Sequence, residues 1–230
     1  MSYDLLIFDW DGTLMDSHAR IVSCLRSAAM EVGLPTRHDE ELRDIIGLGL
    51  DEVMARLFPG VTLTQQEALV ARYRDHFLHI SDVVETLFEG VVETLTQMRD
   101  RGYLLAVATG KSRAGLDRGL RQTGLGGVFE MTRCADESFS KPHPQMLEDI
   151  LKGLGLPPER ALMIGDTEFD LEMARNAGTA SIGVTYGAHP PDRLQRHRPI
   201  ACIDDIRELP GMLARTTSSD DFRNPDVRSQ

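Results

Sequence analysis

The sequence predicts an α/β protein in which a doubly wound, mostly parallel sheet carries an inserted α-helical domain. Three observations lead to this prediction. The apolar run Leu5 to Phe8 ends at two carboxylates and a glycine, as a buried strand does where it enters a turn. A long stretch of purely helical periodicity follows, from residue 16 to about residue 87. From Val91 onward, helical and strand patterns alternate, which is typical of parallel strands joined by right-handed crossovers.

Length, charge and cysteine usage limit the function. The chain has 230 residues, enough for one large domain or for a core with a small accessory domain. Its formal net charge is −11 and its basic residues are not clustered, which argues against nucleic acid as a partner. No stretch approaches the ~20 apolar residues of a membrane span. Three distant cysteines without a CxxC motif predict reduced thiols, so we expect a cytoplasmic protein.

The helical stretch is predicted to form a cap domain, residues 16–87, inserted into a core made of residues 1–15 and 88–214. It follows directly after the acidic end of the first strand. We therefore expect the cap to cover the site at that strand end, on hinge segments near Met15 and Phe88.

Helices of the cap are read from apolar periodicity and capping signals. They are expected at residues 17–32, 39–46, 51–57 and 64–79. Asp16 or Ser17 caps the first helix, which ends before Gly33. The longest one is expected to begin with the capping box Thr64-x-x-Glu67.

The second half of the chain supplies the remaining layers of the core. Helices are expected at residues 91–101, 112–122, 144–153 and 168–176. Strands are expected at residues 104–108, 128–133, 161–164, 180–184 and 200–203. Residues 215–230 are polar and lack a period, so they are predicted to form a polar C-terminal tail.

Asp9 and Asp11 are the first candidates for chemistry. Residues two apart on an extended backbone point to the same side, so the two carboxylates are expected to share one pocket. Like charges this close do not both ionise without cost, so either a divalent cation bridges them or one keeps its proton. The alternative is that Asp and Gly only end a strand and begin a turn.

Three further strand ends carry reactive or charged groups. One strand leads into Thr109-Gly110, Lys141 precedes a proline, and the strand after residue 160 ends in Gly165-Asp166. Each pattern alone is common in turns. Because the carboxyl ends of parallel strands meet at one edge of the sheet, the four segments together predict a single site.

In these motifs the chain resembles the haloacid dehalogenase-like superfamily of phosphohydrolases, over residues 1 to about 209. The family's four signature motifs are Phe8-Asp9-Trp10-Asp11-Gly12-Thr13-Leu14, Thr109-Gly110, Lys141, and Gly165-Asp166 through Asp170. The insert is similar to the α-helical cap of the subgroup that contains phosphoglycolate phosphatases. The resemblance implies a Rossmann-like core and a small phosphorylated metabolite as substrate, and it alone suggests phosphoglycolate.

The resemblance also implies a role for each motif residue in a Mg²⁺-dependent phosphatase. Asp9 is the expected nucleophile, which forms an aspartyl-phosphate, and Asp11 is the expected acid and base. Mg²⁺ suits hard oxygen ligands and offsets the repulsion between carboxylate and phosphate. Its expected ligands are Asp9, Asp11 through its backbone carbonyl, Asp166 and Asp170. The expected phosphate-binding groups are Thr109, the N–H of Gly110 and Lys141.

Two other functions share parts of this pattern. A sugar phosphomutase carries the same four motifs, but phosphomutases of this capped type usually have a histidine where this chain has Ile21. A non-catalytic phosphorylated signalling module also uses clustered acids, a Thr and a Lys, although such modules are shorter and lack a helical insert. Dehalogenases need no second aspartate, so the presence of Asp11 argues against them.

Residues that select the substrate are expected in the cap. Gly47-Leu48-Gly49 lies where capped members of the family carry a substrate-specificity loop, although an ordinary connection between helices explains it equally well. His18, Arg20, Arg43 and Arg72 are candidates to contact a substrate carboxylate, although such charges more often lie on a solvated surface. The sequence predicts no oligomeric state.

Overall fold

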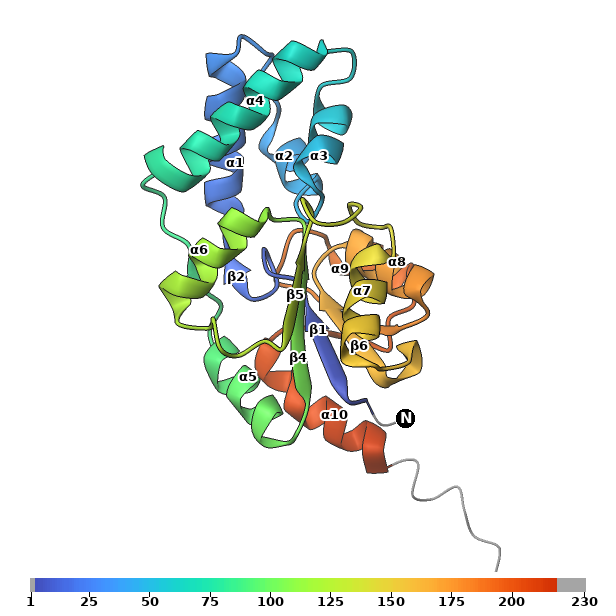
Figure 1. Ribbon diagram of the computed structural model, residues 1–230. Coiled ribbons are helices and arrows are strands. Elements are labelled where there is room, and N and C mark those ends of the chain that lie inside the picture. The colour runs from blue at the N-terminus through green and yellow to red at the C-terminus, as the bar shows by residue number, and fades with distance from the viewer. Residues whose placement is uncertain (1–2, 219–230) are drawn as a thin grey trace, which may run out of the picture.

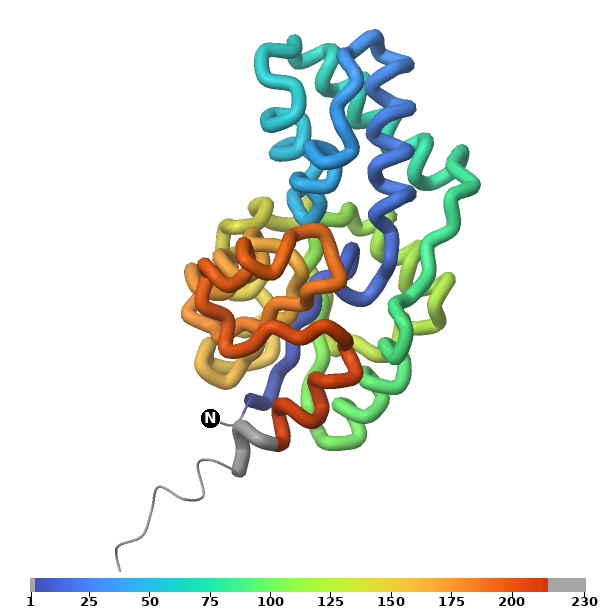
Figure 2. Tube along the Cα trace, turned by 180° about the vertical axis from the view of Figure 1, so that it is seen from behind, coloured from blue at the N-terminus to red at the C-terminus, as the bar shows by residue number. Residues whose placement is uncertain are grey.

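The computed structural model describes residues 3–218 and shows two units, an α/β core and a helical cap (Figure 1). The cap lies beyond the carboxyl ends of the core strands. The chain leaves the core near residue 17 and returns near residue 86. Seen from behind, the cap meets the core only at its base, and the chain crosses twice between the two units (Figure 2).

Six strands form the core sheet in the spatial order β5-β4-β1-β6-β7-β8. They are β1 (Leu5–Phe8), β4 (Leu104–Thr109), β5 (Met131–Cys134), β6 (Ala161–Gly165), β7 (Ala180–Val184) and β8 (Ala201–Ile203). Every described pairing in this sheet is parallel, which confirms the predicted fold class. The chain winds outward from β1 to β5 on one side and from β6 to β8 on the other. The direction in which successive strands are added therefore reverses beside β1. Open α/β sheets bind ligands at such a point of reversal, beyond the carboxyl ends of the strands.

Two helical layers cover this sheet. One layer consists of α5 (Val91–Asp100), α6 (Arg113–Thr123) and α10 (Leu209–Ser218), and the other of α7 (Gln145–Leu154) and α8 (Glu168–Ala177). Leu6 and Phe8 face the first layer, and Leu5 and Ile7 face the second, as the two-residue period of a strand requires. Each of these fully buried side chains contributes roughly 1.5–3 kcal/mol. The short elements α9 (Pro191–Gln195), η2 (Pro158–Arg160) and η3 (Ile206–Glu208) lie in connections.

The cap has an apolar core of its own. It consists of α1 (His18–Glu31), α2 (Asp39–Asp44), α3 (Leu50–Leu57), α4 (Leu63–Asp75) and the π-helical turn η1 (His76–Ile80). Leu25, Met54 and Leu69 are among the buried residues that these helices enclose. The expected run of helices through the insert is thus present, with the last one divided into an α-helix and a π-turn.

The start of α4 differs from the prediction. Its capping box is Thr62 with Gln65, in which the Thr62 side chain accepts a hydrogen bond from the Gln65 N–H. The predicted box at Thr64 and Glu67 is therefore wrong. Both threonines precede a Gln or Glu by three residues, so the pattern alone did not distinguish them.

Both predicted hinge segments pair with each other. β2 (Met15–Asp16) and β3 (Thr86–Leu87) form a two-stranded antiparallel ribbon, in which Met15 lies opposite Leu87. The Phe88 N–H also donates to the Leu14 carbonyl at 3.0 Å. The entry and the exit of the cap are thereby joined by hydrogen bonds, a feature that no strand pattern in the insert indicated.

The C-terminal part differs from expectation in two respects. Helix α10 continues through Ser218, past residue 215 where the polar tail was predicted to begin. Residues 219–230, the remainder of that predicted tail, lie outside the described residues. The weak strand expected at 128–133 is shorter and later, at Met131–Cys134, on the edge of the sheet. Within residues 3–218, no helix combines the length and the apolar character that crossing a membrane requires.

Candidate active site

Four separate segments bring their side chains together at the carboxyl edge of the sheet. Asp9 and Asp11 follow β1, Thr109 ends β4, Asp166 follows β6, and Lys141 comes from the connection between β5 and α7. All five residues are buried. Because β4, β1 and β6 are neighbours in the sheet, chain segments more than 150 residues apart meet here, as in the Thr13–Asp166 hydrogen bond.

Three carboxylates and one ammonium form the centre of the site. One oxygen each of Asp9, Asp166 and Asp170 lies within 4.8 Å of the others. Lys141 Nζ lies 2.9 Å from Asp9 Oδ1 and 2.6 Å from Asp170 Oδ1. Asp9 Oδ2 is buried, and nothing within residues 3–218 donates a hydrogen bond to it. Such an oxygen is destabilising unless a cation or a proton meets it, so the cluster fits a divalent cation.

Burial and mutual repulsion determine how these groups titrate. Burial raises the pKa of Asp9 well above its usual range; Lys141 opposes this shift, and the nearby charges of Asp170 and Asp166 add to it. Burial, with repulsion from Asp170, also raises the pKa of Asp166 to about 7. Burial by itself lowers the pKa of Lys141, but the carboxylates of Asp170 and Asp9 outweigh it and raise that pKa overall. The lysine therefore remains charged, and a further cation would favour full ionisation of the acids.

Asp166 is held in one orientation by two donors and two glycines. Thr13 Oγ1 donates to Asp166 Oδ1, and the Ala188 N–H donates to Oδ2, each at 2.8 Å. A Cβ at Gly12 would lie 2.2 Å from Asp166 Oδ2, and one at Gly187 would lie 2.1 Å from Asp166 Cβ. Gly12 also has a φ of +82°, which side chains rarely adopt. Glycine at these two positions allows the backbone to enclose the carboxylate.

Asp170 has a supporting set of contacts. Its Oδ1 accepts from Lys141 Nζ at 2.6 Å. Its Oδ2 accepts from the backbone N–H of Thr167 at 3.1 Å and from the hydroxyl of the same residue at 2.6 Å. Asp170 therefore orients the lysine and the start of α8, and its predicted role as a metal ligand stays a prediction.

Asp11 is bonded to partners from the hinge side of the core. Its Oδ1 accepts from Ser17 Oγ and from Lys111 Nζ, each at 2.6 Å. Lys111 Nζ also lies 3.7 Å from Glu85 Oε1. Neither Lys111 nor Glu85 is among the site residues predicted from the sequence. The available signal for Lys111 is its position directly after Thr109-Gly110, whereas Glu85 reaches the site only because the hinge segments pair.

The predicted specificity loop, Gly47–Gly49, lies against Gly110, which is in the predicted phosphate-binding segment. A Cβ at Gly110 would lie 2.4 Å from the Gly47 carbonyl oxygen and 2.6 Å from that of Leu48. The Gly49 N–H donates to Ser140 Oγ at 2.8 Å. The loop thus contacts two separate core segments, Gly110 after β4 and Ser140 after β5, which an arbitrary connection between α2 and α3 need not do.

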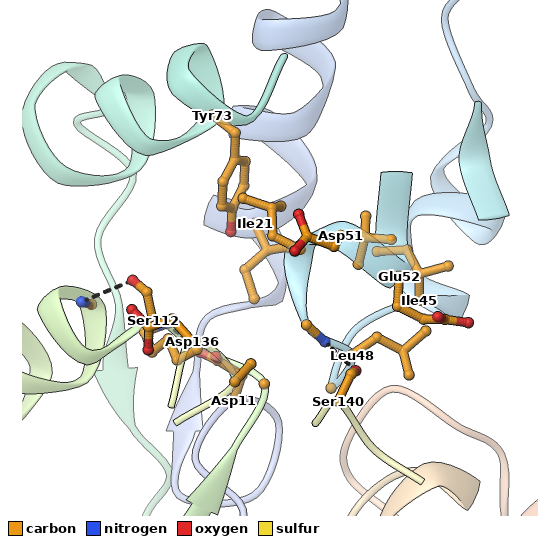
Figure 3. Close-up of a pocket in the computed structure, with 18 of the residues that line it drawn as sticks. Asp11, Ile21, Ile45, Leu48, Asp51, Glu52, Tyr73, Ser112, Asp136 and Ser140 are labelled. Atoms are coloured by element: carbon orange, nitrogen blue, oxygen red, sulfur yellow. Dashed lines mark hydrogen bonds and ion pairs between the residues drawn. The ribbon is translucent and has the colours of Figure 1, made fainter. Parts of the chain in front are cut away.

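A cavity of about 330 Å³ lies between the cap and the core beside this loop (Figure 3). Asp11, Gly110 and Lys111 line it from the core, and Ile21 and Tyr73 line it from the cap. Its volume is at the lower end of the range for small-molecule sites. It adjoins Gly110 and Lys111, at the predicted phosphate-binding segment.

The cap residues expected to contact a substrate carboxylate do not line this cavity. These residues are His18, Arg20, Arg43 and Arg72. Arg20 is buried in the cap, where its guanidinium donates to the carbonyl oxygens of Phe77 and Val83 at 2.5 Å each. Arg72 forms surface ion pairs within the cap, Arg43 is exposed, and His18 Nε2 lies 3.9 Å from the Asp166 carboxylate. The expected contact between these four residues and a substrate carboxylate is therefore not supported in this cavity.

Known sequences resemble this chain over most of its length. A family model described as haloacid dehalogenase-like hydrolase matches residues 6–184. A protein of Dickeya dadantii named as the probable phosphatase IndB is 36% identical over 211 residues, which cover 90% of this chain and 92% of that protein. A phosphoglycolate phosphatase of Vibrio cholerae is 31% identical over 90% of this chain and 96% of its own length. The pyrophosphatase PpaX of Bacillus pumilus is 31% identical over 89% of this chain and 93% of its own length.

A solved structure shares the whole architecture. The crystal structure of a predicted phosphoglycolate phosphatase from Haemophilus somnus has a TM-score of 0.80 to this chain at 25% sequence identity. The similarity covers 92% of this chain and 98% of that one. Coverage this high includes both the core and the cap.

Proposed function

The chain belongs to the haloacid dehalogenase-like hydrolases, and from that membership we propose that it is a Mg²⁺-dependent phosphatase acting on a small phosphomonoester. The observation that carries the proposal is the convergence of Asp9, Thr109, Lys141 and Asp166 at one edge of the sheet. A carboxylate nucleophile, a hydroxyl, an ammonium and a second carboxylate are the groups that phosphoryl transfer through an aspartyl-phosphate requires.

Asp9 is proposed as the nucleophile. Its ionised carboxylate attacks phosphorus in line, and the bond to the alcohol oxygen breaks as the new Asp9–phosphorus bond forms. Lys141, 2.9 Å from Asp9 Oδ1, opposes the effect of burial and favours the ionised form. Thr109, the N–H of Gly110 and Lys141 are proposed to hold the equatorial phosphoryl oxygens, where negative charge is spread in the transition state.

The cation site is proposed at Asp9 and Asp166, with the backbone carbonyl of Asp11. The free, buried Oδ2 of Asp9 and the fixed carboxylate of Asp166 fit a hard cation such as Mg²⁺. When bound, Mg²⁺ neutralises the repulsion between the carboxylates and the phosphoryl group. Asp170 is assigned the supporting role of holding Lys141 and Thr167, because its Oδ1 is already paired with the Lys141 ammonium at 2.6 Å and its Oδ2 accepts from the Thr167 hydroxyl.

Asp11 is proposed as the general acid and base. It donates a proton to the leaving alcohol and then accepts one from the water that hydrolyses the aspartyl-phosphate. Ser17 and Lys111 hold its carboxylate toward the cavity in which that alcohol would lie. No part of this arrangement favours a phosphomutase, since Ile21 lines the cavity and offers no proton-transfer group.

Relatives named for phosphoglycolate and for pyrophosphate support a small phosphorylated substrate. Phosphoglycolate is one member of the proposed class of small phosphomonoesters. A reducing compartment, the cytoplasm, is proposed on the basis of three free cysteines, Cys24, Cys134 and Cys202.

The test is the substitution Asp9→Asn, assayed by phosphate release from p-nitrophenyl phosphate with Mg²⁺. The wild type is expected to release many phosphates per protein molecule, which a signalling module does not do. We expect Asp9→Asn to lose on the order of 10³-fold or more in kcat, because the amide is not a nucleophile. The matched control is Asp100→Asn, an exposed aspartate at the end of α5, which should retain wild-type turnover. A folded Asp9→Asn protein with substantial turnover would remove Asp9 from its role.

A further inference from the structure

The cavity between cap and core has one apolar side. Ile21, Leu25, Tyr73 and Phe77 contribute to this side from α1, α4 and η1. Figure 3 shows Tyr73 extending from the cap helix toward Ile21, with Asp51 beside them. An aromatic ring and branched aliphatic side chains offer a flat apolar surface, which suits the face of a ring better than a short charged group.

The charged residues of the same cavity are mainly acidic. Among the described residues that line it, four carry carboxylates and two carry cations: Asp11, Asp51, Glu52 and Asp136 against Arg74 and Lys111. Lys111 is already bonded to Asp11 at 2.6 Å, and Glu52 is paired with Arg56. Asp51, Arg74 and the second oxygen of Asp136 then remain to meet a ligand, since Asp136 Oδ1 accepts from the Arg113 N–H at 2.9 Å. An added negative charge would meet more repulsion than attraction here.

Hydroxyl-binding groups are also present at the cavity. Ser138 lines it, and its Oγ is buried with no hydrogen-bond partner in the described part of the chain. Asp51 and Asp136 are exposed there and accept hydrogen bonds when ionised. Neutral hydroxyl groups can satisfy all three, whereas a carboxylate can satisfy only Ser138.

We propose that the alcohol part of the substrate is uncharged and ring-bearing, so that the phosphoryl group is the only anionic part of the molecule. The ring face lies against Tyr73 and Ile21, and its hydroxyl groups meet Asp51, Asp136 and Ser138. A sugar phosphate belongs to this class, whereas phosphoglycolate and pyrophosphate, each with a second anionic group, do not. This inference rests on the proposed phosphatase function and selects among its substrates.

The test compares two small esters matched in size and one larger ester that carries a ring. Phosphoglycolate and 2-hydroxyethyl phosphate differ by a carboxylate in place of a hydroxymethyl group, and ribose 5-phosphate adds a ring. We expect kcat/KM to be about tenfold or more higher for 2-hydroxyethyl phosphate than for phosphoglycolate, and higher again for ribose 5-phosphate. Equal or greater kcat/KM for phosphoglycolate would overturn the inference.

A charge reversal tests whether the acidic residues cause this preference. Asp51→Lys should lower the ratio of kcat/KM for 2-hydroxyethyl phosphate to kcat/KM for phosphoglycolate about tenfold or more. Asp51→Asn should lower this ratio less. The matched control is Glu67→Lys, which makes the same charge change on an exposed cap helix position that does not line the cavity. The control should keep the wild-type ratio. If both Asp51 variants, or the one that folds, keep the same ratio as Glu67→Lys, the assignment is wrong.

The apolar side is tested separately through Tyr73. Tyr73→Ala should lower kcat/KM for ribose 5-phosphate more than for 2-hydroxyethyl phosphate. Tyr73→Phe should keep the wild-type preference for ribose 5-phosphate, because it keeps the aromatic ring. An equal effect of Tyr73→Ala on both esters would contradict a ring-binding role.

The phosphatase function and the substrate class are contradicted by different results. Absence of turnover for every ester, including p-nitrophenyl phosphate, would contradict the phosphatase function itself. Turnover of p-nitrophenyl phosphate together with preference for phosphoglycolate would contradict only the substrate class.

Discussion

Lys141 and the acids around it bear on how an acidic protein would bind the proposed phosphoryl group. The chain carries a net charge of −11, yet Lys141 is almost fully buried between Asp9 and Asp170. Local charge is what a bound phosphoryl group meets, because the interaction of distant surface charges is screened within about 10 Å at ordinary salt. In the proposed reaction, the buried ammonium and the proposed cation therefore decide phosphate binding, and the overall charge has little influence.

Asp166 makes the stability of the metal-free protein depend on pH. Its pKa is raised to about 7 in the folded protein, above the ordinary value near 4 expected in the unfolded chain. Between these values the folded state holds a proton that the unfolded state has lost, so stability falls as pH rises from about 4 to 7. The change is on the order of a few kcal/mol, at roughly 1.4 kcal/mol per pH unit. Chemical denaturation at several pH values, without Mg²⁺, measures it.

Asp166→Asn is the matched variant for this prediction. It keeps the shape of the side chain and removes its titration, so its stability should fall less over the same pH range. Mg²⁺ should stabilise the wild type more at pH 8 than at pH 5, since it binds the ionised acid. A wild type and a variant with the same pH dependence would show that Asp166 does not titrate abnormally.

At the level of elements, the loop between α2 and α3 couples the cap to the proposed phosphate-binding segment at Gly110. The carbonyl oxygens of Gly47 and Leu48 lie where a side chain on Gly110 would be. A glycine at 110 is therefore required for the cap to approach this closely. The loop and the end of strand β4 form one contact, although more than 60 residues separate them in the sequence.

Gly110→Ala tests this contact. The added methyl group would force the loop away from the core, and displacement of about 1 Å near a reacting centre can reduce the rate about 100-fold. We expect a fall in kcat/KM of at least tenfold, with a thermal midpoint that changes little because the cap can shift outward. Gly127→Ala is the control, because its added methyl group would meet nothing within 4 Å. Wild-type kcat/KM in Gly110→Ala would contradict the coupling.

Strong periodicity made most elements predictable. Strand β7 has the predicted bounds, Ala180–Val184, because a short apolar run between polar turns has few alternatives. Helix α10 was missed because Pro210-Gly211 resembles a helix breaker, although proline is well tolerated in the first turn of a helix. The short α9 has too few residues for a period to be visible.

For the site, the sequence predicted the convergence of those residues that directly follow strand ends. The four motifs meet because parallel strands share one edge, which needs no knowledge of packing. The contacts of Lys111 and Glu85, and the residues that line the cavity, depend on how the cap lies on the core. Arg20 illustrates the limit, since a buried arginine inside the cap and a substrate-binding one look the same in a sequence.

In the whole molecule, a cluster of charges joins the cap, the hinge and the core. Glu85 Oε2 lies 3.6 Å from Arg20 in the cap and 3.6 Å from Arg118 in α6. Arg118 Nη1 also donates to the Phe77 carbonyl at 2.9 Å. These contacts tie the end of the cap to the core while the cavity is covered, so their loss should favour an open arrangement.

Arg118→Ala should expose the return segment of the cap. Partly exposed ion pairs contribute about 1 kcal/mol, which corresponds to roughly fivefold in an opening equilibrium. We expect a Glu-specific protease to cleave after Glu85 several-fold faster in this variant, as measured by mass spectrometry of the fragments. Arg121→Ala, an exposed arginine in the last turn of the same helix, is the control. The same cleavage rate in both variants would show that Arg118 does not hold the cap.

The β2–β3 ribbon has a consequence for how such proteins diversify. Because the two ends of the insert lie side by side and are bonded to each other, the cap can be exchanged for another helical unit without moving β1 or β4. A chimera that keeps this core and receives a foreign insert at the ribbon should retain the catalytic machinery and acquire the donor's choice of alcohol.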